Sequence, residues 1–192
     1  MSVSASDLDT VLQAVSNVCF DGKLSYFHAY FMDEEKDLPE KTLKEAAGCF
    51  FDGFERIYLN RGCFEQVDEE LVQVVFHELV HAYCWKNNAQ DDCIDGYHTE
   101  VFKRGCEEHG AECFFGLHGF SYSLLKPEVL RSICREIDRL EREKEEMAER
   151  IARKRGELWL YCLEHADDED DEILTLGKFG CMGGNRREKK TW

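Results

Sequence analysis

The pattern His-Glu-x-x-His at His77, Glu78 and His81 is the part of the sequence best suited to chemistry. On a helix, residues four apart project from one face, so the two imidazoles can reach a single zinc ion. Glu78 lies beside the first histidine, and from that position its carboxylate cannot join the metal shell. It is therefore the candidate general base for a water molecule, and the pattern predicts zinc-assisted hydrolysis of a peptide bond.

A catalytic zinc takes three protein ligands and keeps a fourth position for water. Two residues downstream of the pattern, His98 and Glu100, are candidates for the third ligand. A histidine there would give a three-histidine site, whereas a carboxylate would give the arrangement of gluzincin peptidases. Spacing alone leaves both alternatives open.

Four other polar residues near the pattern have less specific roles. Tyr83 and Tyr97 could stabilise a developing oxyanion, although packing explains each of them more simply. His109 and His118 lie beside glycines in polar surroundings, which is typical of surface or hydrogen-bonded histidines rather than ligands.

Apolar periodicity predicts the elements that would position this site. Together they indicate an α+β, zincin-like metalloprotease domain with an N-terminal helix capped by Ser6, a small antiparallel sheet and a buried pattern helix. Residues 112–123 combine glycines with phenylalanines and are predicted to be irregular. The other predicted elements are a helix at 5–18, strands at 26–32, 47–51 and 55–59, the pattern helix at 66–88 and a helix at 98–109.

A long helix with a heptad pattern is predicted at 127–161. This seam could pair two copies of the chain in a coiled coil, or it could fold back over the preceding domain. The predicted organisation is a metalloprotease domain at 1–125, the long helix at 126–165 and a charged tail at 166–192. The apolar seam residues are Leu130, Ile133, Ile137, Leu140, Met147, Ile151 and Leu158, with Lys144 and Lys154 in the remaining positions.

Composition bounds the setting in which this chemistry would operate. The net charge of −16 is far from a nucleic-acid-binding signature, which requires clustered Lys and Arg. We expect no membrane span and no secretory signal, because no apolar run is long enough and the first residues lack the usual pattern. Ten cysteines without a signal indicate reduced thiols or metal ligands, and therefore an intracellular protein, cytoplasmic or nuclear.

Four segments between residues 17 and 109 resemble the SprT-like zinc metalloprotease family. The resemblance implies that His77, His81 and His98 bind Zn2+, that Glu78 is catalytic and that Glu100 is not a ligand. The segments are Phe20-Asp21-Gly22-Lys23-Leu24, Arg56-Ile57-Tyr58-Leu59-Asn60, His77-Glu78-Leu79-Val80-His81-Ala82 and His98-x-x-x-Phe102.

The resemblance also implies an endopeptidase acting on proteins bound or crosslinked to DNA, although the acidic charge argues against a broad DNA-binding surface. The sequence departs from the family at Thr99, where glycine usually follows the third histidine. The C-terminal zinc ribbon of many members is reduced to Cys162, His165 and Cys181, which lack a fourth ligand. The alternatives are a non-catalytic, zinc-stabilised protein-interaction module and a gluzincin-like peptidase that uses Glu100.

Overall fold

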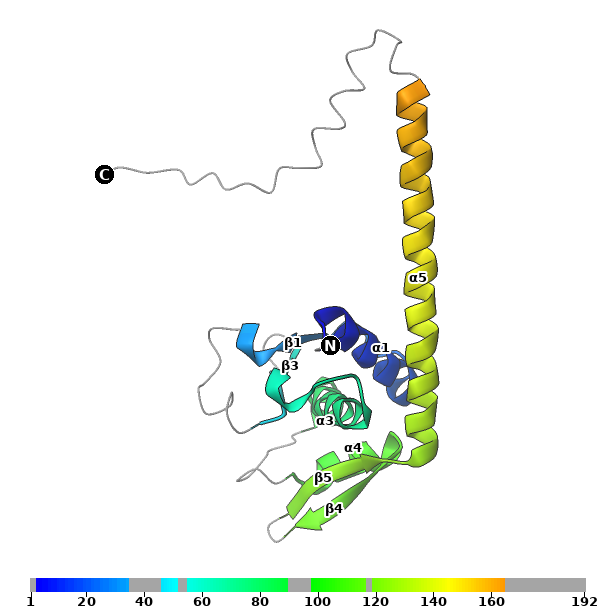
Figure 1. Cartoon of the computed structure of the whole chain (residues 1–192). Coiled ribbons are helices and arrows are strands. Elements are labelled where there is room, and N and C mark those ends of the chain that lie inside the picture. Colours follow the sequence, from blue (N-terminus) through cyan, green and yellow to red (C-terminus); the bar gives the residue numbers. More distant parts are fainter. Residues whose placement is uncertain (1–2, 35–45, 52–54, 90–97, 117–118, 165–192) are drawn as a thin grey trace, which may run out of the picture. The chain divides into compact units, whose positions relative to one another are not determined.

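The computed structural model describes residues 3–34, 46–51, 55–89, 98–116 and 119–164 (Figure 1). Its helices and small sheets make it an α+β protein with a long C-terminal helix, as the sequence predicts. Two compact units, Met1–Lys144 and Glu145–Trp192, make up the chain.

Helix α1, Ala5–Phe20, confirms the predicted N-terminal helix, but its cap is Ser4 and not Ser6. The Ser4 hydroxyl accepts a hydrogen bond from the Asp7 amide, and the Asp7 carboxylate accepts one from the Ser4 amide. This reciprocal capping box satisfies two backbone donors at the start of the helix. Ser6 lies inside the first turn, where its carbonyl oxygen accepts a hydrogen bond from Thr10 Oγ1. The helix ends where Asp21 and Gly22 adopt positive φ angles.

Three short strands, β1 (His28–Phe31), β2 (Gly48–Phe51) and β3 (Arg56–Leu59), form a sheet in the order β1-β3-β2. The strands lie where the sequence predicts them. The prediction of an antiparallel sheet is wrong for one pair, because β1 runs parallel to β3 whereas β2 is antiparallel to it. Parallel pairing needs a long crossover connection, and the chain between β1 and β3, which includes β2, provides it.

Helix α3, Glu69–Lys86, carries the His-Glu-x-x-His pattern through the core. The Asp68 side chain caps it by accepting a hydrogen bond from the Leu71 amide. Helix α4, Glu100–Glu108, packs against α3 at Gly105, where an added Cβ would lie 3.0 Å from Val80 Cγ1. Glycine at this crossing therefore permits the close approach of α4 to α3.

Residues 112–123 are predicted to be irregular, but the described ones among them belong to two strands, β4 (Ala111–Gly116) and β5 (Gly119–Leu125). The strands pair antiparallel, with Ala111 opposite Leu125. The prediction is wrong because Gly116 ends β4 and Gly119 begins β5, so neither glycine interrupts a strand. The aromatic residues within the two strands favour extended backbone. The Leu125 amide donates to Gln73 Oε1 at 2.9 Å, which joins the strand pair to α3.

Helix α5, Pro127–Glu164, begins within the first unit. Its seam residues Ile133, Ile137 and Leu140 are at most 8% exposed and belong to the same core as α1. Asn17 of α1 donates to Glu136 Oε1 at 2.8 Å. The first half of the heptad seam therefore folds back on the N-terminal domain, which is one of the two predicted arrangements. Among the described residues, no helix is long and apolar enough to cross a membrane.

Candidate metal centre

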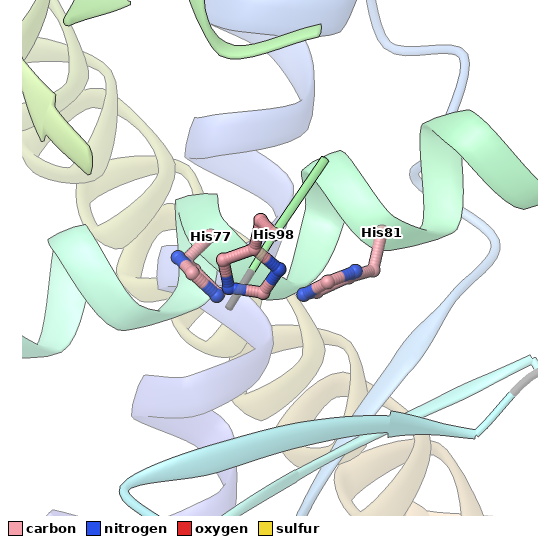
Figure 2. Close-up of side chains that lie close together, drawn as sticks. All are labelled: His77, His81 and His98. Atoms are coloured by element: carbon pink, nitrogen blue, oxygen red, sulfur yellow. The ribbon is translucent and has the colours of Figure 1, made fainter. Parts of the chain in front are cut away.

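Three histidines from two parts of the chain converge in the first unit (Figure 2). His77 and His81 project from successive turns of α3, and His98 lies just before α4. One ring nitrogen of each lies within 4.8 Å of the corresponding nitrogens of the other two. This group could hold a metal ion, and the structure thus brings together the three residues that the sequence predicts as ligands.

Phe102 forms a common apolar support for these three rings. It lies one helical turn after His98 and is fully buried. Its ring stacks on His98 with centroids 4.0 Å apart, and its centroid is 4.7 Å from those of both His77 and His81. The sequence identifies Phe102 only as an inward-facing residue that belongs to the family motif. The structure shows that its ring contacts every imidazole in the group, a position from which it can limit their orientations.

The electrostatics at His77 favour a neutral imidazole. Burial holds the pKa of His77 well below its usual value, and the neighbouring His81 and His98 lower it further. Neutral imidazole is the form that binds metal ions. A tetrahedral zinc with nitrogen ligands at about 2.0–2.1 Å requires those nitrogens to lie about 3.4 Å apart. The ligand nitrogens of the three histidines lie within 4.8 Å of one another, so they could hold a metal ion if they closed to the spacing that zinc requires, with one tetrahedral position left over.

Glu78 is 5% exposed and lies at the point where strand β2 meets α3. A Cβ added at Gly48 would be 3.0 Å from Glu78 Oε1 and 2.8 Å from Val74 Cγ1. Burial and, secondarily, the charge of Glu78 raise the pKa of the neighbouring Cys49 to about 12. Sequence reasoning missed Gly48, although a glycine that begins a strand is a signal of close backbone approach.

The alternative third ligand, Glu100, lies outside the three-histidine group. Its side chain is 78% exposed, and its carboxylate lies 3.6 Å from Lys103 Nζ. The structure therefore favours His98 over Glu100 as the residue that completes the site, and it gives the gluzincin-like alternative no geometric support.

The remaining candidates have structural roles or lie outside the described residues. Tyr83 packs against Phe20 and His109, with ring centroids 5.9 and 4.3 Å away, as the packing interpretation predicts. His109 Nδ1 lies 2.6 Å from the Cys19 carbonyl oxygen, so His109 is a hydrogen-bonded histidine. No disulfide joins the described cysteines. Four of the candidate residues lie outside the described ranges: Tyr97, His118, His165 and Cys181.

The α+β unit and its convergent histidines define a domain able to hold a metal ion. Residues 9–120 match the model of the SprT-like family, and the chain belongs to this family. The family is generally associated with metalloprotease activity. No curated protein and no solved structure gave a significant match to the chain.

Proposed function

We propose that this protein is a zinc-dependent endopeptidase of the SprT-like type. The observation that carries the proposal is the convergence of His77, His81 and His98, with the buried Glu78 directly after His77 in the chain. When bound, zinc would lower the pKa of a water molecule and polarise the carbonyl of the scissile peptide bond.

The roles of the protein's own groups follow from their positions. The three imidazoles would hold the metal, and the buried ring of Phe102 packs against all three of them. Glu78 accepts a proton from the attacking water through its carboxylate and then delivers it to the nitrogen of the leaving amine. Gly48 leaves the space that this carboxylate occupies, because any side chain there would displace it.

The proposed substrates are proteins bound or crosslinked to DNA, within an intracellular setting that is cytoplasmic or nuclear. The family resemblance supports this part of the proposal, and the reduced thiols agree with the compartment. The net charge of −16 means that any contact with DNA would be local rather than spread over the surface.

A non-catalytic zinc module is less consistent with the site. A purely structural zinc site has four protein ligands, whereas the described residues bring together three. A structural role also gives no reason to bury the charged side chain of Glu78, which directly follows His77 in the chain.

The proposal is tested by incubating the purified chain with an unfolded protein substrate. We expect cleavage by the zinc-loaded protein, loss of cleavage after chelation and recovery when zinc is restored. Parallel reactions with and without single-stranded DNA test the substrate class, because action on DNA-bound proteins predicts faster cleavage when DNA is present. Failure of zinc to restore cleavage would contradict the metallopeptidase assignment.

A further inference from the structure

The second half of α5 exposes apolar side chains at heptad spacing. In the second unit, Met147, Ile151 and Leu158 are 51%, 47% and 63% exposed. They continue the seam whose earlier members are buried in the core of the first unit. The apolar residues of such a helical stripe are normally covered by another helix. The described residues of the second unit provide no such cover.

Charged residues flank this stripe in a specific order. Arg150 and Glu157 directly precede Ile151 and Leu158, the a positions of the heptad, so both occupy position g and lie along the same edge of the stripe. Arg155 follows Lys154 and lies along the opposite edge. All four side chains are exposed.

This charge order disfavours pairing with a second copy in parallel. In a parallel coiled coil, equal seam positions meet, and each residue at heptad position g faces the residue five places later on the partner helix. Lys154 would then lie against Lys154 of the second copy. Arg150 would face Arg155 of the second copy, and like charges at these positions are destabilising.

Antiparallel pairing turns the same residues into matched contacts. With the two helices centred between Ile151 and Lys154, Met147 of one copy lies against Leu158 of the other. Ile151 then lies against the aliphatic stem of Lys154, whose ammonium group reaches the edge of the seam. Arg150 of each copy faces Glu157 of the other, so two oppositely charged pairs flank the seam.

We propose that the helix of the second unit pairs antiparallel with the same helix of a second copy, through Met147, Ile151 and Leu158. The paired stretch is about two heptads long, so the complex should be weak and reversible. This inference is independent of the peptidase proposal, because it concerns residues outside the metal centre.

Sedimentation equilibrium of the full chain, from low micromolar to several hundred micromolar, tests the pairing. We expect a monomer–dimer equilibrium that Leu158→Asp weakens at least about tenfold, because the change places a carboxylate in the seam. Circular dichroism of each variant would verify that helix content is retained.

Charge reversal tests the orientation. Arg150→Glu replaces two attractive pairs by two Glu–Glu pairs in the antiparallel dimer, and it should weaken association about tenfold. The double variant Arg150→Glu/Glu157→Arg should restore it to near the wild-type level. Arg153→Glu is the matched control, because it makes the same charge change away from the seam and should leave the dissociation constant nearly unchanged.

Three outcomes would overturn the proposal. The first is a monomer at every concentration, and the second is an equal loss of association in Arg150→Glu and Arg153→Glu. The third is stronger association of Arg150→Glu, which would indicate a parallel dimer in which the introduced carboxylate faces Arg155 of the second copy. None of these outcomes depends on zinc or cleavage, so each is distinguishable from failure of the peptidase proposal.

Discussion

Gly48 of strand β2 lies so close to Glu78 of helix α3 that a Cβ on Gly48 would be 3.0 Å from the Glu78 carboxylate oxygen and 3.1 Å from its Cγ. Gly48, the first residue of β2, thus limits the space available to the proposed general base. The position of the carboxylate depends on the absence of a side chain at residue 48.

Gly48→Ala should therefore impair catalysis without removing the metal. The added methyl group would displace the Glu78 carboxylate, and small misplacements of a catalytic group lower rates by about 100-fold. We expect wild-type zinc content and a reduced kcat/KM in a peptide-cleavage assay. Gly156→Ala is the control, since a Cβ there meets nothing within 4 Å. Full activity of Gly48→Ala would show that the carboxylate does not need this space.

Replacement of His98 should lower the zinc content of the protein, whereas replacement of Glu100 should not. His98→Ala removes one of the three convergent imidazoles, so bound zinc should fall well below one ion per chain. Glu100→Ala removes an exposed carboxylate paired with Lys103 and should leave zinc content unchanged. Elemental analysis after equal dialysis provides the comparison. Zinc retained in His98→Ala but lost in Glu100→Ala would reverse the ligand assignment.

Phe102→Leu should lower zinc affinity more than the same substitution at a buried phenylalanine elsewhere in the core. Loss of the ring that supports all three imidazoles should lower zinc affinity about 10- to 100-fold, as for other groups that orient ligands. Phe64→Leu is a matched control, because Phe64 is also buried, at 3% exposed, but belongs to the core outside the ring cluster. Competition with a zinc-binding dye measures both variants. Equal zinc affinities in the two variants would contradict the orienting role of Phe102.

Glu136→Gln should loosen the attachment of α5 to α1 in a pH-dependent manner. Hydrogen bonds from Arg139 and then from Asn17 lower the pKa of Glu136 from 4.5 to about 2. A depressed pKa in the folded state stabilises the protein above the unfolded-state value of 4.5, and this contribution is lost as the pH falls towards about 2.

At neutral pH we expect Glu136→Gln to lower the free energy of unfolding by about 1 kcal/mol, since solvent screens a group so near the surface. Urea denaturation from pH 7 to pH 3 should show this difference shrinking. Glu143→Gln, which removes only the exposed contact with Arg139, should have a smaller effect. A difference that stays constant with pH would contradict the assigned role of the carboxylate.

The sequence predicts the elements with strong periodicity and leaves the long-range geometry open. Helix α3 and the positions of His77, Glu78 and His81 follow from apolar spacing and a motif that is local to one helix. Spacing does not separate His98 from Glu100, and the choice requires a family resemblance, because the third ligand comes from another element. The approach of Gly48 to Glu78 depends on how β2 packs on α3, which a single sequence does not encode locally.

The errors have similar physical origins. The parallel pairing of β1 with β3 depends on a crossover between distant segments. The β4–β5 pair is not predicted from the sequence, because Gly116 and Gly119, at the ends of the two strands, suggest that the whole stretch is irregular. The heptad seam indicates a long helix, but only the structure separates Ile133 and Ile137, which are buried, from Met147 and Ile151, which are exposed.

Glu78→Gln tests the central claim most directly, because it removes the proton-accepting charge while keeping the size of the side chain. We predict a folded protein that binds zinc as the wild type does and cleaves an unfolded protein substrate about 100- to 10,000-fold more slowly. Unchanged cleavage by zinc-loaded Glu78→Gln would contradict the proposed mechanism.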